Sequence, residues 1–466
     1  MEKSLRILTV LTFVMASFAA LAFFFHDIES TPQTDIHVIK YSDSFLKSIE
    51  DGTVGDFALE MRKYPLFYTA SFSAARKITE PIFTLPVLKN MPLHQQLYAV
   101  GRLFTLLFAI GIIIVLFRLS KMLTGKPHAA ILMLSSILFI VFSTAIRPHI
   151  PVAFWTLLSF MFAEEFKREK SAKWKLTASY ASAIMAFGTL QNGFFAFLFP
   201  FWAHATSSKR HWIKAAIVLA VCTSIVIIIG YPFIFNTANK VGFDLGHNYG
   251  NAWDGFGFVT LGTTMSGSEL ILGFFAVLSI AKIIKDKNVN EINKFAPAMV
   301  FVSAIFLIFG MYGGTAPRFF MITLPFIALI GALSFKEAPI KAKIAVLIII
   351  ILLNGRLTQL ALKPNTYQIA STYLNENTQG ILGTDLPFYY LSIPYERFAS
   401  EEQQHLIEHI VTNAGKHDID DMTTCHEVIS SRWDNDMFLW TEVPWGLFKI
   451  WQAERLGPNL EVLCKI

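Results

Sequence analysis

Side chains that can transfer protons or bind anions crowd into one polar segment, directly after the first hydrophobic run of the chain. They comprise a carboxylate, an imidazole, two ammonium groups and two phenols: Asp35, His37, Lys40, Tyr41, Lys63 and Tyr64. Asp35 stands close enough to the hydrophobic run to reach a substrate whose lipid tail stays in the bilayer. A carboxylate placed there can accept the proton of an attacking hydroxyl group. We therefore expect chemistry at the membrane surface, with Asp35 as the base.

Cationic side chains mark the ends of several later hydrophobic segments. Arg147 and His149 separate the third segment from the fourth, and Arg318 precedes the tenth. A charge at a membrane edge is expected to have a partner, because an unpaired ion is costly there. The planar guanidinium donates two parallel hydrogen bonds to a phosphate, so a lipid phosphate suits Arg147 and Arg318. The alternatives are snorkelling towards water and pairing with a loop carboxylate.

The composition is that of a protein which lives in a membrane. Of its 466 residues 54% are hydrophobic and 16% are charged, and the mean hydropathy is +0.49. Soluble domains carry about 25% charged residues. The net charge of +5 comes from short Lys and Arg clusters between apolar runs. These clusters are topology signals, so we expect no nucleic-acid partner.

About eleven segments have the length and composition of a membrane helix, allowing for short or broken spans. They are Leu5–Phe25, Tyr98–Leu119, Ala129–Ile146, Pro151–Phe166, Leu176–Leu190, Phe194–Ala205, Ile213–Phe235, Ile271–Ile284, Pro297–Met311, Phe319–Leu333 and Ala342–Leu360. Residues Thr189–Gly193 are either a tight turn between the fifth and sixth segments or a break in one long span, and the distribution of basic residues favours the turn. The alternative for the first segment is a cleaved signal peptide, but it exceeds the usual apolar stretch of about 7–15 residues.

Basic residues predict which connections face the cytoplasm. With the N-terminus inside, alternate connections hold Lys and Arg clusters, at residues 118–126, 167–175, 209–214, 282–294 and 336–343. The opposite short connections hold only Arg147, Lys240 and Arg318. This asymmetry follows the positive-inside rule. It predicts a multi-pass protein of the plasma (inner) membrane whose segment 26–97 and whose C-terminal part lie outside.

The chain becomes polar after residue 360, which predicts two parts: a membrane part, 1–360, and an extracytoplasmic α/β domain, 361–466. Within the second part we expect a helix at Thr366–Asn377 and a strand from Ile381. Apolar residues in Glu401–Ala414 fit one face of a second helix. A third helix is expected over Pro444–Leu456 and a last strand over Leu460–Ile466. Cys425 and Cys464 of this domain can pair in an oxidising compartment.

The sequence lacks the motifs of several common enzyme classes. The sequence has no C-x-x-C, no H-E-x-x-H and no P-loop, which disfavours redox, zinc-protease and nucleotide-driven functions. It also has no Asn-x-Ser/Thr glycosylation site. A long chain on the lumenal side of a eukaryotic secretory membrane usually carries such sites. Their absence favours a prokaryotic membrane, with a periplasmic or extracellular active face.

The polar segment and two later elements follow one another in a recognisable order. Asp35 comes shortly after the first span, Ser48–Gly52 ends a helix, and Lys63–Leu66 reads Lys-Tyr-Pro-Leu. Val100–Phe104 opens the second span with Arg102 and Leu103, and Ala316–Pro325 holds Arg318 and a later Leu-Pro. This order resembles the C-type glycosyltransferases, which use lipid-phosphate sugars, in particular the aminoarabinose transferases and protein O-mannosyltransferases.

The resemblance implies a polytopic α-helical membrane protein that catalyses an inverting glycosyl transfer. The donor would be a polyprenyl-phosphate-linked monosaccharide, and the acceptor a lipid, a glycan or a protein. One base is chemically sufficient, because the leaving phosphate is already a stable anion and needs no general acid of the kind glycosidases carry. The other residues named above would then bind the substrates.

Two positions depart from the family pattern and leave the metal requirement open. Ile36 stands where the family often has a second acidic residue, and Arg62 where an acidic residue precedes Lys63. A second carboxylate would come from Asp43, Asp56 or Glu60, and a divalent cation remains a candidate cofactor. Two other functions stay open: a transporter or flippase for a lipid-linked sugar, and an O-antigen polymerase or ligase.

The predicted topology can be measured with reporter fusions. Fusions after Lys175, Lys214 and Lys343 should report the cytoplasm, and fusions after Lys240 and at Ile466 the outside. A cytoplasmic signal at Ile466 would contradict the eleven-span arrangement and the placement of the C-terminal domain.

Overall fold

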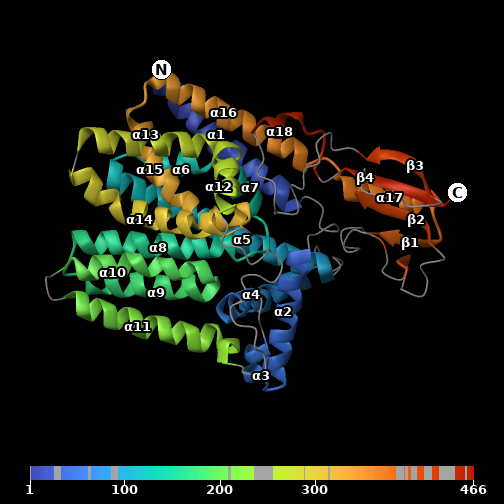
Figure 1. Cartoon of the computed structure of the whole chain (residues 1–466), viewed down its shortest axis with the longest axis horizontal. Helices are drawn as coiled ribbons and strands as arrows, with labels where there is room; N and C mark the ends of the chain where they lie inside the picture. Colours follow the sequence, from blue (N-terminus) through green and yellow to red (C-terminus); the bar gives the residue numbers. More distant parts are fainter. Residues whose placement is uncertain are drawn as a thin grey trace.

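The computed structural model describes residues 2–25, 33–60, 65–85, 93–207, 211–235, 255–287, 289–312, 315–384, 393, 397–399, 407–413, 422–429, 447–456 and 459–465. Long helices lie side by side in one bundle, and a small sheet lies beyond one end of it (Figure 1). We call that end the sheet-side end. The opposite end is the basic end, because four of the long helices carry Lys or Arg in their last turn there.

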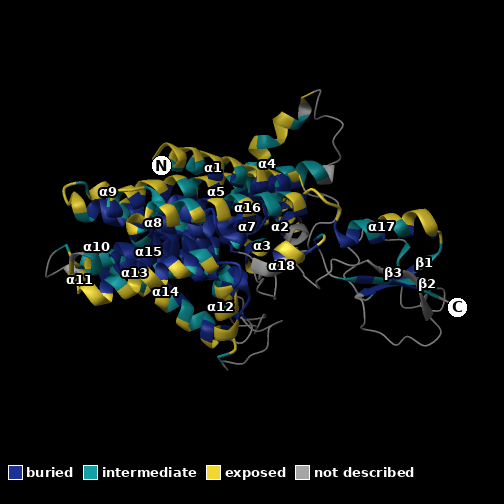
Figure 2. Cartoon of the chain, turned by 90° about the horizontal axis from the view of Figure 1, so that it is seen from above, coloured by how far each residue is buried: buried dark blue, intermediate teal, exposed yellow. Residues whose placement is uncertain are grey.

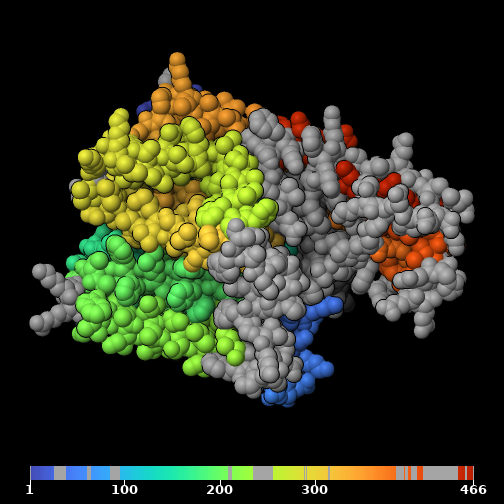
Figure 3. Space-filling view, viewed as in Figure 1, coloured from blue at the N-terminus to red at the C-terminus, as the bar shows by residue number. Residues whose placement is uncertain are grey.

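The bundle helices follow the predicted apolar segments closely. They are α1 (Glu2–Phe25), α5 (Leu93–Thr124), α6 (His128–Met133), α7 (Ile137–Phe142), α8 (His149–Arg168), α9 (Lys173–Thr189), α10 (Leu198–Ala205), α11 (His211–Gly230), α12 (Gly257–Ser266), α13 (Leu270–Asp286), α14 (Val289–Met311), α15 (Leu324–Glu337) and α16 (Ile340–Ala361). In the space-filling view, the yellow and orange half formed by α12–α16 packs against the green half formed by α8–α11 (Figure 3).

α15 lies at the centre of the bundle, and α11 lies at its edge. In the segment Pro317–Glu337, which holds α15, 83% of the apolar window is buried, against 17% in Trp212–Gly230 of α11. Phe326 of α15 packs its ring against Phe160, Phe199 and Phe301, with centroids 4.6–5.6 Å apart. Buried residues fill the same centre in Figure 2. Apolarity alone does not separate these positions, because lipid tails are as apolar as a protein interior.

Fewer helices meet the length and apolarity expected of a membrane span than the eleven segments that were predicted. Within the described residues, six helices are long and apolar enough to cross a membrane. A seventh is added if α12 and α13, which meet at 98°, form one broken span. The protein is therefore a multi-pass membrane protein, while the eleven-span count remains a prediction.

One predicted span is broken, and one predicted turn is present. The segment Ala129–Ile146 forms two short helices, α6 and α7, because the chain turns at Leu134–Ser136 and Ser136 caps α7 by accepting from the Phe139 N–H. The chain turns at the predicted Gln191: the Gly193 N–H donates to the Leu190 carbonyl at 2.8 Å, and the 3-10 helix η2 (Gln191–Phe197) begins there. Gly193 is needed there, since a Cβ atom would lie 2.1 Å from the Ala186 carbonyl oxygen.

The segment between α1 and α5 forms short helices at the sheet-side end. They are α2 (Gln33–Glu50), α3 (Val54–Glu60), α4 (Leu66–Thr79) and the 3-10 helix η1 (Glu80–Thr84). α2 ends where Gly52 adopts a φ of 70°, a left-handed conformation that glycine reaches without strain. The predicted Gly-terminated helix is thus present.

The C-terminal part folds as one helix on a four-stranded sheet. α17 (Thr366–Asn377) has the predicted bounds and begins with a capping box between Asn365 and Gln368. The strands β1 (Ile381–Thr384), β2 (Ile407–Asn413), β3 (Met422–Ile429) and β4 (Leu460–Lys465) are ordered β1-β2-β4-β3. β1 and β2 are parallel, and β4 is antiparallel to both β2 and β3.

The helix expected at Glu401–Ala414 is wrong over residues 407–413. That stretch is strand β2, which pairs with a strand on each side. Its β-branched residues Ile407, Ile410, Val411 and Thr412 favour a strand, and this preference prevails over the apparent helical spacing. Strand β3 was not predicted. Helix α18 (Leu447–Gln452) covers the middle of the expected Pro444–Leu456, and Cys464 is disulfide-bonded, while Cys222 is free.

The C-terminal part is anchored to the bundle through backbone groups. Arg356 of α16 donates to the carbonyl oxygens of Ile450, at 3.1 Å, and Ala453. Lys363 donates to the carbonyl of Glu454 at 3.0 Å. These bonds hold the chain around α18 against the sheet-side end of α16.

Candidate active site

Three elements meet at the sheet-side end of the bundle. The first is the connection from α7 into α8, which carries Arg147. The second is the 3-10 helix η4 (Pro317–Thr323), which packs on α7, α8 and α15. The third is the pair of helices α2 and α4, packed on each other and, through α4, on α5. Of the predicted site residues, Asp35, His37, Lys40, Tyr41, Arg147, His149 and Arg318 belong to these elements or to the start of α8.

Arg147, His149 and Arg318 lie together here although they come from two distant parts of the chain. Each side chain is buried, with 6% of its residue surface exposed. The His149 ring packs between Phe142 and Phe319, with centroids 5.9 and 6.4 Å away. The Arg318 guanidinium lies 5.2 Å from the centroid of the Phe319 ring, and both arginine charges act on the imidazole. We call these three residues the Arg-His cluster.

The Arg-His cluster is suited to an anion. Two guanidinium groups held beside one imidazole repel each other, and burial removes water that would screen them. An anion with several oxygens relieves this repulsion and accepts hydrogen bonds from both forks. Nδ1 of His149 is buried and has no hydrogen-bond partner among the described residues, so the imidazole can bond a ligand as well.

A hydrophobic cluster fixes the helices α2 and α4 beside the Arg-His cluster. We call it the loop cluster, and its buried members are Val38, Ile39, Tyr68, Phe72, Tyr98, Val100 and Ile146. Tyr68 and Phe72 pack against the ring of Phe104 at 6.3 and 5.9 Å. Ile146, which is fully buried, directly precedes Arg147. The loop cluster therefore ties α2 to the backbone that positions Arg147.

Polar contacts between α2 and α4 reinforce this arrangement. The hydroxyls of Ser42 and Ser73 are 2.8 Å apart, and Arg76 donates to Ser42 at 2.6 Å. Arg76 also forms an ion pair with Asp43 at 2.6 Å. Asp43, a candidate for a second carboxylate, is therefore already paired in this structure.

The structure places some predicted residues and leaves others outside the described side chains. Asp35 and His37 belong to the first turns of α2, which begins at Gln33, but their side chains lie outside the described residues, as do Lys63 and Tyr64. Lys40 is exposed on α2. Tyr41 is half-buried next to the loop cluster, and burial raises the pKa of its phenol.

Arg102 contacts the end of α1. Its guanidinium donates to the carbonyl oxygens of Phe23 and Phe24, at 3.3 and 2.6 Å. These carbonyls belong to the last turn of α1, where helices leave their C=O groups without intrahelical partners. The hydrogen bonds give Arg102 a structural role at this end of the bundle, and its predicted contact with substrate stays a prediction.

Two residues beside the site were not predicted to take part in it. Arg76 joins α4 to α2, as described above. Glu269, at the bend between α12 and α13, is 1% exposed and accepts a hydrogen bond from the backbone N–H of Leu138, at 3.2 Å. It therefore satisfies a free N–H in the first turn of α7, the helix that leads to Arg147. An acidic residue at the edge of an apolar segment was the available signal for Glu269.

Metal ligands do not gather among the described side chains. Within that part of the chain, no three His, Cys, Asp or Glu residues lie close enough together to hold an ion. Asp35, His37 and Glu60 fall outside it, so the divalent cation considered from the sequence stays an open proposal.

Comparison with known proteins identifies the fold. No family model and no curated protein matches the sequence. The structure is similar to ArnT from Cupriavidus metallidurans in the apo state, with a TM-score of 0.52 and 11% identity over 86% of this chain and 92% of that one. The same protein bound to undecaprenyl phosphate gives a TM-score of 0.51 at equal identity and coverage.

A second similar structure is the archaeal oligosaccharyltransferase AglB from Archaeoglobus fulgidus, solved with an inhibitory peptide and a dolichol-phosphate. Its TM-score is 0.47 at 11% identity, over 86% of this chain and 69% of that one. The likeness to ArnT shows that this chain has the fold of that protein, a polytopic helical bundle followed by a small domain that contains a sheet.

The loop cluster should hold α2 and α4 in place, which predicts a local effect of truncating it. Phe72 is fully buried, so Phe72→Ala should cost about 3–5 kcal/mol of local stability. Hydrogen exchange of α2 and α4 should accelerate, while α15 should stay protected. The control is Ile78→Ala on the same helix, where Ile78 is 76% exposed. Equal exchange in both variants would contradict the role of the loop cluster.

Proposed function

We propose that this protein is a glycosyltransferase that moves a monosaccharide from a polyprenyl-phosphate donor to an acceptor at the outer face of the membrane. The observation that carries the proposal is the Arg-His cluster, which puts two buried guanidinium groups and an imidazole at one end of a bundle with the fold of ArnT. A structure of ArnT holds undecaprenyl phosphate, a ligand of the chemical class that such a cluster suits.

The position of the Arg-His cluster fits a lipid-linked phosphate. Arg147 and His149 lie at the sheet-side end of α8, and Arg318 lies in η4, directly before the central helix α15. A phosphate bound there stays at the membrane edge, so its polyprenyl chain can remain among the lipids. The sugar attached to the phosphate would then face the layer of α2 and α4.

In the proposed reaction an acceptor oxygen attacks C1 of the sugar from the face opposite the phosphate. The bond between C1 and the phosphate oxygen breaks, so the product is inverted and polyprenyl phosphate leaves. Asp35 takes the proton of the acceptor hydroxyl. Arg147, Arg318 and His149 stabilise the charge that builds on the departing phosphate.

The placement of α2 supports Asp35 as the base. Asp35 lies in the first turns of this helix, and Val38 and Ile39, directly after it, belong to the loop cluster. The same cluster contains Ile146, the neighbour of Arg147. The proposed base and the proposed phosphate site are thus attached to one packed unit. Lys40, Tyr41, Lys63 and Tyr64 are proposed to bind the sugar or the acceptor, which is a lipid, a glycan or a protein.

Replacing the base should abolish turnover without unfolding the protein. Asp35→Asn keeps the size of the side chain but cannot accept a proton, so turnover should fall by about 10²–10⁴-fold. Transfer of a labelled sugar from polyprenyl phosphate in purified membranes measures this. Asp51→Asn, at the exposed end of α2, is the control and should be near normal. Normal transfer by Asp35→Asn would exclude Asp35 and direct attention to Asp43 or Glu60. Adding a chelator to the same assay tests the divalent cation.

Replacing Arg318 by Lys separates a phosphate ligand from a structural cation. Lysine keeps the charge but loses the planar fork, so Arg318→Lys should weaken use of the donor by about tenfold or more, with expression unchanged. The measurement is the apparent affinity for polyprenyl-phosphate sugar at a fixed acceptor concentration. Arg397→Lys, in the C-terminal part, is the matched control, because Arg397 bonds only Asn375 and Thr378 among the described residues. An unchanged donor affinity in both Arg318→Lys and Arg318→Ala would eliminate the phosphate role.

A further inference from the structure

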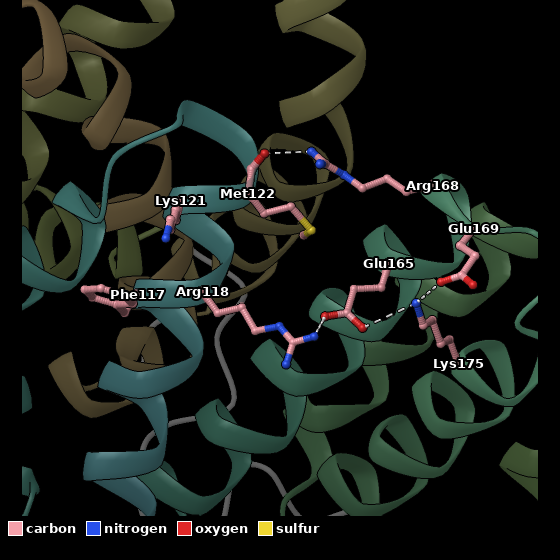
Figure 4. A pocket seen from close by; sticks show the side chains of 8 residues that line it. All are labelled: Phe117, Arg118, Lys121, Met122, Glu165, Arg168, Glu169 and Lys175. Atoms are coloured by element: carbon pink, nitrogen blue, oxygen red, sulfur yellow. Dashed lines mark hydrogen bonds and ion pairs between the residues drawn. The ribbon is translucent and has the colours of Figure 1, made fainter.

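A hollow of about 470 Å³ opens at the basic end of the bundle, far from the Arg-His cluster. It lies between α5 on one side and α8 and α9 on the other (Figure 4). Six of its lining residues are charged: Arg118, Lys121, Glu165, Arg168, Glu169 and Lys175. Four cations therefore face two carboxylates, and the hollow has an excess of two positive charges.

Both carboxylates are already paired with cations of the hollow. Glu165, which is 7% exposed, lies 2.5 Å from the Arg118 guanidinium and 4.0 Å from the Lys175 ammonium. Lys175 also pairs with Glu169 at 2.6 Å. A buried carboxylate needs such partners, because burying an unpaired charge is costly. Glu165 thus holds Arg118 and Lys175 at the wall of the hollow.

The other two cations have no carboxylate partner among the described residues. Arg168 donates to the neutral carbonyl oxygen of Met122, at 2.7 Å, and this bond joins α8 to α5. Lys121 is exposed on α5. Figure 4 shows their side chains on the rim around the open space. The uncompensated charge of the hollow therefore belongs to Lys121 and Arg168.

An apolar stripe on α5 leads along the helix to this hollow. Leu103, Leu107, Ile110, Ile114 and Phe117 are each 41–63% exposed and recur three or four residues apart, so they share one face of the helix. Phe117, the last of them, also lines the hollow. The stripe runs across the membrane and ends beside the cations.

We propose that the hollow binds the phosphate-bearing head group of an anionic membrane lipid, with its acyl chains along the stripe on α5. A phosphodiester supplies the negative charge that Lys121 and Arg168 lack, and it accepts hydrogen bonds from the Arg168 guanidinium. A soluble anion would use the charges alone, whereas a lipid also covers the stripe. The Lys and Arg distribution predicts that this end faces the cytoplasmic leaflet, which is rich in anionic lipids. The bound lipid would bridge α5 and α8. This proposal does not depend on the glycosyltransferase function.

Native mass spectrometry of the full-length protein in detergent can test the proposal. Phosphatidylglycerol should be retained at lower concentration than zwitterionic phosphatidylcholine. In the double variant Lys121→Gln with Arg168→Gln, the apparent affinity for phosphatidylglycerol should fall by about tenfold, and the affinity for phosphatidylcholine should not change. This variant leaves the buried Glu165 with both of its partners, so the fold should be preserved.

The matched control is Lys285→Gln with Lys341→Gln, which removes two exposed cations from other helices of the basic end. It should bind phosphatidylglycerol like the unchanged protein. An equal loss of affinity in both double variants would show a general charge effect and overturn the site. Equal binding of phosphatidylglycerol by the Lys121→Gln, Arg168→Gln variant and the unchanged protein would also overturn it. Saturation of the site by soluble glycerol phosphate at the same concentration would show a soluble-anion site in place of a lipid site.

Discussion

A charged side chain that leaves water must meet a partner, and this constraint organises both ends of the bundle. Helix ends near the membrane also leave N–H and C=O groups without intrahelical partners. Arg102 meets the free carbonyls of α1, and Glu269 meets a free N–H of α7. At the basic end, Glu165 meets Arg118. Charged side chains that are costly to bury therefore form the polar contacts that connect neighbouring helices.

The same constraint applies to the Arg-His cluster, which holds two buried positive charges close together. Arg147 and Arg318 come from distant segments, yet both act on the one imidazole of His149. Placing two positive charges together at a buried position is costly, and the fold maintains it through the packing of η4 on α7 and α8. An anionic ligand would lower this cost, and this is the physical basis of the phosphate site that we propose.

The sequence predicted the apolar helices well, because each of them must bury or expose to lipid a long apolar surface. It did not predict the break at Leu134–Ser136, where Ser136 caps α7 and Glu269 from a distant segment accepts from the Leu138 N–H. The sequence pattern also predicted a helix in place of β2, because the residues of one segment do not reveal which other strands it will pair with.

Arg147, His149 and Arg318 were predicted individually from positive charge at the membrane edge. Their convergence could not be predicted, since it depends on how η4 packs against α8. For Arg102, the family resemblance implied a contact with substrate, and the partners described for it are main-chain carbonyls of α1.

The C-terminal part is anchored through main-chain atoms, which stay the same when side chains change during evolution. Arg356 and Lys363 bond main-chain carbonyls at Ile450, Ala453 and Glu454, and a carbonyl is present whatever side chain stands there. Exposed side chains near this junction can therefore change while the anchor persists.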